Sequence, residues 1–220
     1  LHGYKLINQH QLLTSNHILE IQAILEPNKS GFRKLMGTAL KNSTGEVVYL
    51  PPQNPQDIIE LMSNLDKYIN LPELHDVDPL IKMAIIHHQF ESIHPFYNGN
   101  GRTGRIINIL YLVYMQLLDI PVLYLSRYIN QNKADYYRLL QTVRVGNSWN
   151  EWVIWMLTGV SVTSRQTVEL IRQIKQLMND FQQKIQMDAA NIYSKELLDS
   201  LFKYPYTKIK FIEDDLAVHR

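Results

Sequence analysis

The sequence contains no cysteine. This absence excludes a disulfide framework and any metal site built from thiolates. An excess of one charge is also missing, because 22 Lys and Arg stand against 21 Asp and Glu, with a formal net charge of +1. A broad nucleic-acid-binding surface is therefore not expected, although a local basic patch stays open.

Long hydrophobic runs are lacking as well. The most apolar stretch, residues 106–125, is interrupted by Asp119 and Pro121, which leaves 13 residues before the break. A membrane-spanning helix needs about 20, so we expect a buried helix here and no membrane partner. The first ten residues, LHGYKLINQH, do not resemble a signal peptide. Together with the missing cysteine, this favours the cytoplasm.

What is present is mainly helical periodicity. At 220 residues, 45% of them apolar, the chain can bury a core without covalent staples. Ser15 or Asn16 is the expected N-cap of the first helix. Helices are predicted over residues 16–25, 57–69, 79–92, 104–118, 133–144 and 149–186.

Two stretches do not continue this series of helices. Residues 34–42 and 45–52 are short and tolerate β-structure, with Asn-Ser-Thr-Gly between them and two prolines at the end, which predicts a hairpin. Residues 194–220 predict a helix, a Tyr-Pro-Tyr turn and a second short helix. The final residues resemble the start of an element, and the chain begins with Leu, so we expect a fragment of a longer protein.

The segment HPFYNGNGRTGR, residues 94–105, concentrates the unusual residues of the chain. Its Asn-Gly pairs are typical of tight turns, but a turn needs neither the histidine nor the arginines. The glycines at 99, 101 and 104 also fit the dinucleotide pattern G-x-G-x-x-G, yet a helical segment precedes them where that pattern requires a strand. A phosphate-binding P-loop is excluded too, because Arg105 and Ile106 stand where Lys and Ser or Thr would be.

An anion cradle at a helix N-terminus accounts for more of these residues. Glycines let main-chain N–H groups approach a phosphate closely. Arg102 and Arg105 are three positions apart, so they project from the same helical turn, and a guanidinium matches phosphate oxygens well. Asn100 would add a neutral donor. His94, directly before the cradle, could take a proton from an attacking nucleophile. This arrangement predicts phosphoryl or nucleotidyl transfer.

The same segment resembles the signature of the Fic family, His-Pro-Phe-x-(Asp/Glu)-Gly-Asn-Gly-Arg-x-x-Arg. The likeness extends outward to residues 87–96, 126–140 and the hairpin, and covers about residues 1–190. It implies a mainly α Fic-type helical core with a small β-hairpin flap over about residues 34–50. Residues 191–220 would begin a partial winged-helix or helix-turn-helix module. The residues that match the signature are His94, Pro95, Phe96, Gly99, Asn100, Gly101, Arg102 and Arg105.

The resemblance implies a protein adenylyltransferase, which transfers AMP from ATP to a Tyr, Thr or Ser hydroxyl of a target protein. His94 would be the general base, and Phe96 would anchor the loop in the core. Arg102 would hold the β- and γ-phosphates, and Arg105 would help to orient the γ-phosphate. The nucleotide and phosphate site would comprise Gly99, Asn100, Gly101, Arg102, Arg105, Tyr136 and Tyr137.

The two tyrosines, Tyr136 and Tyr137, are expected either to stack on adenine or to pack in the core. The flap would clamp the target by strand addition. Self-modification and a homodimer are further partner relations that the resemblance leaves open. The flap residues expected to position the target are Lys34, Leu35, Met36, Gly37 and Thr38.

Asn98 departs from the family pattern, which has Asp or Glu at the position that helps to hold Mg²⁺. Because Mg²⁺ prefers charged oxygen ligands but relies on phosphates and water, we expect weaker magnesium binding and slower transfer.

For two further groups of residues we expect structural roles or no activity of their own in this chain. His87, His88, Glu91 and His94 do not have metalloprotease spacing, and core or capping roles are expected for His87 and His88. Because residues 191–220 stop before a complete module, DNA binding is expected only in a longer chain.

No inhibitory Ser/Thr-x-x-x-Glu-Gly/Asn stretch occurs in the sequence. A weakly active nucleotide-binding regulatory module, coupled to DNA binding, is the alternative function. A de-AMPylating phosphodiesterase is another.

Overall fold

The computed structural model describes residues 1–42, 44–71 and 77–217. Over these residues the predicted mainly α fold with one small hairpin is confirmed. The elements are α1 (His2–His10), α2 (Ser15–Leu25), β1 (Leu40–Lys41), β2 (Val47–Tyr49), α3 (Pro55–Asn70), α4 (Pro79–Ile93), α5 (Asn100–Tyr114), α6 (Leu125–Gln131), α7 (Lys133–Gly146), α8 (Trp149–Asp188), α9 (Lys195–Phe202) and α10 (Ile209–Leu216).

The chain divides into two compact units, Leu1–Ser164 and Arg165–Arg220, and the division falls within the long helix α8. The first unit contains the whole of the 94–105 segment. The boundary expected near residue 190 lies inside the second unit. Among the described residues, no helix combines the length and the apolar character needed to cross a membrane.

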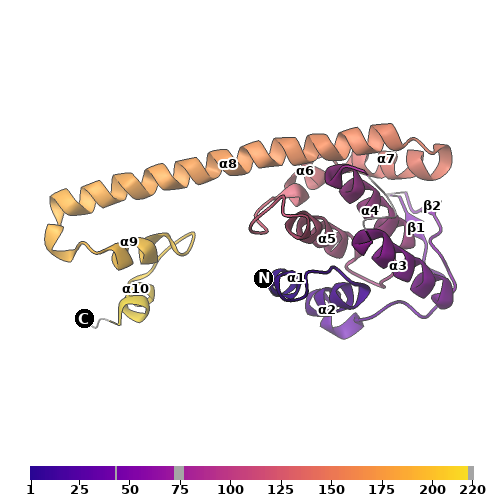
Figure 1. Ribbon diagram of the computed structural model, residues 1–220, viewed down its shortest axis with the longest axis horizontal. Coiled ribbons are helices and arrows are strands. Elements are labelled where there is room, and N and C mark those ends of the chain that lie inside the picture. Colours follow the sequence, from indigo (N-terminus) through magenta and orange to yellow (C-terminus); the bar gives the residue numbers. More distant parts are fainter. Residues whose placement is uncertain (43, 72–76, 218–220) are drawn as a thin grey trace. The chain divides into compact units, whose positions relative to one another are not determined.

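The first unit is organised around α4 and α5, which lie side by side at its centre (Figure 1). Helix α4 also contacts α3, and α5 contacts α1 and α2. Helix α4 is apolar on most faces, as expected for a helix that is covered on several sides. Its residues Met83, Ile86 and Phe90 are fully buried. The two central helices are thus a rigid base for the segment that joins them.

The helices that lead to this segment are capped by polar side chains. Thr14 caps α2 in a capping box with His17, so the cap lies one or two residues before the predicted one. Asp78 caps α4 through the N–H of Leu80, with Pro79 in the first turn. Helix α5 begins at Asn100, four residues earlier than predicted, and therefore within the 94–105 segment.

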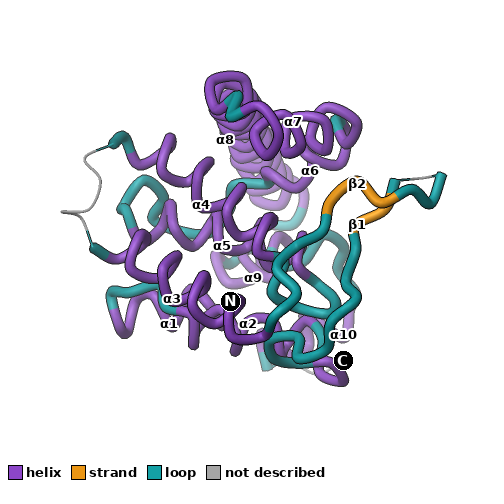
Figure 2. The backbone as a smooth tube through the Cα atoms, turned by 90° about the vertical axis from the view of Figure 1, so that its right-hand side faces the viewer, coloured by secondary structure: helices purple, strands orange, loops and turns teal. Residues whose placement is uncertain are grey.

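The hairpin is shorter than the sequence predicted. Only Leu40–Lys41 and Val47–Tyr49 pair, in antiparallel register, and Figure 2 shows these strands in orange. The segment Lys34–Thr38 is not a strand, because Gly37 adopts a left-handed φ of 98° that breaks the extended conformation. Ser43, in the predicted turn, lies outside the described residues.

Tyr49 of β2 connects the hairpin to the helices. Its hydroxyl donates to the carbonyl of Ser92 near the end of α4 at 3.0 Å. The guanidinium of Arg144, on α7, lies 3.8 Å from the centroid of the Tyr49 ring, which is a cation–π geometry. The hairpin is therefore tied to the end of α4, directly before His94.

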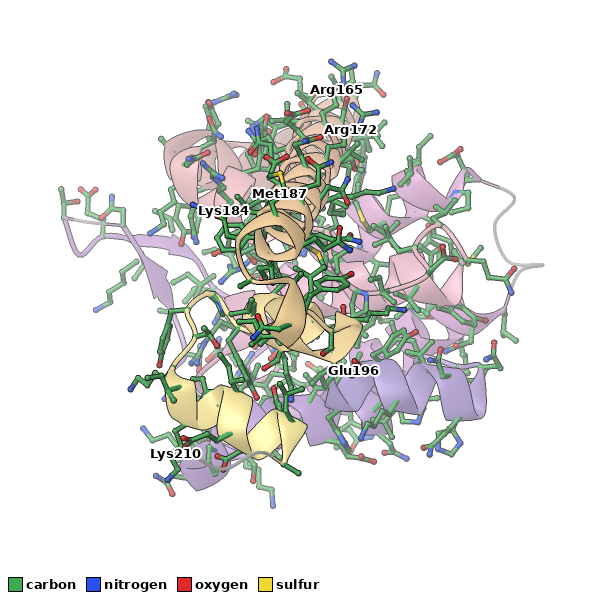
Figure 3. All side chains as sticks on the ribbon, turned by 90° about the vertical axis from the view of Figure 1, so that its left-hand side faces the viewer. Arg165, Arg172, Lys184, Met187, Glu196 and Lys210 are labelled. Atoms are coloured by element: carbon green, nitrogen blue, oxygen red, sulfur yellow. The ribbon has the colours of Figure 1, made fainter. Side chains whose placement is uncertain are left out.

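In the second unit, α9 and α10 follow the end of α8 in the predicted order of helix, turn and helix. Phe181 of α8 packs edge-on against Phe202 of α9, and Ser200 donates to Asp215 of α10. Side chains of both charges are spread over the unit, including Arg165, Arg172, Lys184, Glu196 and Lys210 (Figure 3). No strand occurs among its described residues, which end at 217, so the wing of the expected module is not seen in this part of the chain.

Candidate active site

His94 occupies the turn directly after α4. Its backbone has a left-handed φ of 48°, and its N–H donates to the carbonyl of Phe90 at 3.0 Å. This conformation is uncommon for a residue other than glycine and is held only where its surroundings determine it. It ends the helix abruptly and turns the chain toward α5.

Two neighbours fix the start of this turn. Phe96 is fully buried and packs against Phe32 and Phe90, as the predicted anchoring role requires. Arg33, which is 1% exposed, donates from its main-chain N–H to the carbonyl of Pro95 at 2.8 Å. Its Nε also donates to the carbonyl of His94 at 3.0 Å. The sequence contains no pattern that marked Arg33 for this position.

The side chain of Asn100 joins the start of α5 to the loop between α4 and α5 by hydrogen bonds to the main chain of Phe96. Its Oδ1 accepts from the N–H of Phe96 at 2.9 Å, and its Nδ2 donates to the carbonyl of Phe96 at 2.8 Å. The side chain is buried. The side-chain amide that we expected to serve an anion is thus engaged with Phe96.

The first turn of α5 is a set of main-chain donors. Gly99 precedes it with a φ of 83°, a conformation that favours glycine. Thr103 is the first residue whose N–H bonds back into the helix, to the carbonyl of Gly99 at 2.8 Å. The N–H groups of Asn100, Gly101 and Arg102 therefore have no partner within the helix, and they lie at its positive end. This turn is suited to bind an anion.

The two arginines of the segment differ in their surroundings. Arg102 is half exposed and forms an ion pair with Glu26, the residue that follows α2. Arg105 is partly buried. Its guanidinium lies close to Gly101, because a Cβ added to that glycine would stand 3.2 Å from Nη1 of Arg105. Both guanidinium groups flank the first turn of α5, as their spacing predicted, and sequence reasoning missed Glu26.

The histidines of this region are neutral at physiological pH. Burial lowers the pKa of His94 to about 4, and the nearby charges of Arg33 and Arg144 act in the same direction. His94 is half-buried, with its Nδ1 enclosed by protein. A neutral imidazole can accept a proton, so His94 is in the state that a general base requires.

His87 and His88 have the core roles that the sequence suggested. The Nε2 of His87 lies 2.9 Å from the hydroxyl of Tyr136, and the Nε2 of His88 lies 3.2 Å from the carbonyl of Leu140. Burial lowers the pKa of each to about 4. Both rings join α4 to α7, and the His87 ring also lies against Gly104 of α5.

Tyr136 and Tyr137 separate into two roles. Tyr136 is 4% exposed, bonded to His87 and packed against Trp152 and Trp155. It is a core residue, and its predicted adenine stacking is wrong for this structure, because no face of its ring is open. Tyr137 is 63% exposed, so the stacking prediction now rests on Tyr137 alone.

The donor set for Mg²⁺ is sparse. Asn98 is exposed and offers one neutral amide oxygen. No group of three or more His, Cys, Asp or Glu side chains that could hold a metal ion occurs among the described residues. These residues suit an ion that is held mostly by the phosphate oxygens of a ligand and by water.

Tyr97 connects the active-site loop to the flap. Its hydroxyl accepts from the N–H groups of Lys34 and Leu35, at 2.8 and 3.0 Å. Leu35 and Met36, further along this segment, are 70% and 73% exposed. The resemblance predicted the flap but did not identify Tyr97 as its contact with the loop.

Comparison with known proteins gives two family matches. Residues 12–112 match the Fic/DOC family. Residues 177–220 match a family described as the C-terminal domain of SoFic-like protein adenylyltransferases. The first match contains the loop, the cradle and Glu26, and the second lies within the second unit.

Relatives with similar sequences include protein adenylyltransferase fic-1 of Caenorhabditis briggsae, 27% identical over 150 residues, which are 65% of this chain and 28% of that protein. Protein adenylyltransferase Fic of Aedes aegypti is 28% identical over 150 residues, covering 64% of this chain and 27% of the relative. The chain thus spans little more than a quarter of the length of these relatives.

Similar folds occur in solved structures. A Fic family protein from Desulfovibrio desulfuricans superposes with a TM-score of 0.66 at 19% identity, covering 99% of this chain and 61% of the other. Fic-1 from C. elegans superposes with a TM-score of 0.58 at 18% identity, covering 78% and 50% of the two chains. These likenesses concern the fold.

Proposed function

Because residues 12–112 place the chain in the Fic/DOC family, we propose that it is a protein adenylyltransferase, which transfers AMP from ATP to a hydroxyl side chain of a target protein. The observation that carries the proposal is the position of a neutral His94 directly before the donor turn of α5. Base and anion site lie on one short loop, where a nucleophile and a phosphate can meet. The adenylyltransferase names of the relatives support the same chemistry.

His94 acts as the general base in this proposal. Since Nδ1 is enclosed, Nε2 is the nitrogen that accepts the proton of the target hydroxyl. The hydroxyl oxygen then bonds to the α-phosphorus of ATP, the bond from that phosphorus to the bridging oxygen breaks, and pyrophosphate leaves with the electron pair. The left-handed turn at His94, held by Arg33 and Phe96, keeps the ring in place during this exchange.

The cradle stabilises the charge of the phosphates. The free N–H groups of Asn100, Gly101 and Arg102 would donate to phosphate oxygens, and the guanidinium groups of Arg102 and Arg105 would bind the outer phosphates. Magnesium supplies further neutralisation of the phosphate charge when it is bound. On the protein side Asn98 would hold it, through its amide oxygen.

The flap binds the target segment. The chain from Lys34 to Thr38 is held at one end by Tyr97, and β1 offers main-chain groups on its edge for an added strand. Such pairing is tolerant of target sequence, because main-chain bonds dominate it. Tyr137, exposed on α7, is the residue we assign to adenine stacking.

The proposal is tested by incubating the purified chain with ATP labelled at the α-phosphate and with Mg²⁺. Label is expected on the chain itself or on proteins of a lysate, and it is expected to disappear in His94→Ala. The matched control is His10→Ala, an exposed histidine at the end of α1.

Two observations favour a second candidate, a nucleotide-binding module with little catalysis. Arg102 is engaged by Glu26 and the metal position holds a neutral residue. ATP binding without label transfer at any magnesium concentration would support this module and contradict the adenylyltransferase.

A further inference from the structure

Glu91 lies on α4, three residues before His94, and the reaction described above gives its carboxyl no part. The residue is 7% exposed. Its Oε1 is buried and accepts no hydrogen bond within the described part of the chain. A carboxylate in such a place is unfavourable unless its surroundings compensate, so its position needs a physical reason.

The first turn of α5 lies directly against this carboxyl. A Cβ on Gly104 would stand 2.8 Å from Oε1 of Glu91, and a Cβ on Gly101 would stand 3.8 Å from it. The same Cβ on Gly101 would stand 3.2 Å from Nη1 of Arg105. The carboxyl therefore lies against the helical turn whose N–H groups form the anion cradle.

The groups that face Glu91 come from three helices. Arg105 faces it from α5, and Arg144 and Tyr136 face it from α7. Arg144 also donates to the main-chain carbonyl of Glu91 at 3.2 Å. On α4 itself, His87 lies one turn away and shares the contact with Gly104.

Only one member of this set changes charge near neutral pH. Burial raises the pKa of Glu91 to about 7, although the two arginines act in the opposite direction. His87 stays neutral because burial lowers its pKa to about 4. Tyr136 stays neutral because burial raises its pKa well above the ordinary value.

We propose that Glu91 is a positioning residue of the cradle, which takes up a proton when a polyphosphate binds and releases it when the polyphosphate leaves. Added negative charge beside a buried carboxyl favours its neutral form. The neutral carboxyl no longer competes with phosphate for Arg105, so the arginine is available to the ligand. The proton comes from solvent and returns to it. This inference rests on the proposed nucleotide site.

The test measures protons directly. The probe is α,β-methylene ATP, an analogue that binds as a triphosphate but cannot transfer AMP. Its binding at pH 7 is followed by titration calorimetry in two buffers with different enthalpies of ionisation, for the wild type, Glu91→Gln and the control Glu60→Gln on the exposed face of α3. The wild type and the control are expected to take up about half a proton more than Glu91→Gln, since a group with a pKa near 7 is half protonated at that pH.

Equal proton uptake in the wild type and Glu91→Gln overturns the inference while leaving the nucleotide site intact. Absence of any binding by the wild type overturns the proposed function as well.

If Glu91→Gln does not fold, the wild type alone decides. Phosphate ionises near pH 6, so above pH 7 its own titration is small. The Kd of the analogue is then expected to rise about tenfold between pH 7 and pH 8.5, and an unchanged Kd overturns the inference.

Discussion

At the scale of single residues, we expect Asn98 to limit how the proposed site uses magnesium. Asn98→Asp places a charged oxygen where the wild type has a neutral one. We expect transfer to become severalfold faster and to reach half its maximum at a lower Mg²⁺ concentration. The measurement is the rate of label incorporation from ATP across a magnesium titration, with the exposed Asn64→Asp on α3 as the matched control. A variant that is no faster at any magnesium concentration contradicts this.

Glu26 sets a second limit, because its carboxylate pairs with Arg102. A phosphate group has to displace this carboxylate before it can use the guanidinium. The pair is partly exposed, and such pairs contribute about 0.2–1 kcal/mol. Glu26→Gln is therefore expected to lower the Kd of ATP by a factor of about 1.4 to 5, measured by calorimetry.

The matched control for Glu26→Gln is Glu20→Gln on α2, where the glutamate pairs with His2 and not with the cradle. The Kd of this control should equal that of the wild type. If Glu26→Gln binds ATP no more tightly than Glu20→Gln, the pair does not compete with phosphate.

At the scale of elements, the close approach of α4 and α5 depends on Gly104. An added Cβ would meet Glu91, Phe90 and His87 at 2.8, 3.1 and 3.4 Å. Gly104→Ala is expected to lower the free energy of unfolding by about 1–3 kcal/mol through overpacking. Urea unfolding followed by tryptophan fluorescence measures this, since all three tryptophans of the chain lie between residues 149 and 155 in the first unit.

Gly146, at the end of α7, is the matched control for Gly104. An added Cβ there meets only the hydroxyl of Ser148, at 3.5 Å, and alanine is the better helix former by about 1 kcal/mol. Gly146→Ala should therefore leave the free energy of unfolding unchanged or raise it. Equal destabilisation by the two substitutions would show that the helix contact is not the cause.

The sequence predicted most helices, because a 3.6-residue apolar period is a strong local signal. It missed α1 and α6, whose residues are mixed and polar. It also started α5 too late, because Gly99 and Gly101 are typical of loops. The early start depends on the left-handed cap at Gly99 and on the bonds between Asn100 and Phe96, which no periodicity reveals.

Within residues 94–105, the sequence motif predicted the positions of the site residues. The spacing placed Arg102 and Arg105 on one helical turn shortly after His94, and both arginines lie at the start of α5. Which of two adjacent tyrosines faces the core depends on the packing of α7 against Trp152 and Trp155, which a sequence cannot show. The burial of Glu91 did have a signal, because it lies four residues after His87 in a helix that is apolar on most faces.

At the scale of the whole molecule, the net charge of the chain does not select its ligands. The net charge is +1, so the field of the chain as a whole attracts neither nucleic acid nor nucleotide strongly. The cradle therefore depends on local donors and on a few charges that neighbouring elements bring together. Several of these charged or titratable groups lie on or next to α4, and they give the stability of the first unit a definite dependence on pH.

His87, His88 and His94 have pKa values near 4 in the folded chain, against an ordinary value of 6.5. Between these values the unfolded chain binds more protons than the folded one, so stability falls as the pH drops from 6.5 toward 4. Glu91 opposes this, because its pKa rises from 4.5 to about 7 on folding. Its contribution is fully present below pH 4.5 and is lost as the pH rises through 7.

Three histidines outweigh one glutamate, so the urea midpoint of the tryptophan signal is expected to decrease between pH 6.5 and pH 4.5. In Glu91→Gln the opposing contribution is absent, and the decrease should be steeper than in the wild type. A midpoint that stays constant or rises over this range in the wild type would mean that the three rings are protonated in the folded chain. In that case burial would not hold the pKa of His94 near 4, and its ring would carry a proton over part of the range below pH 6.5.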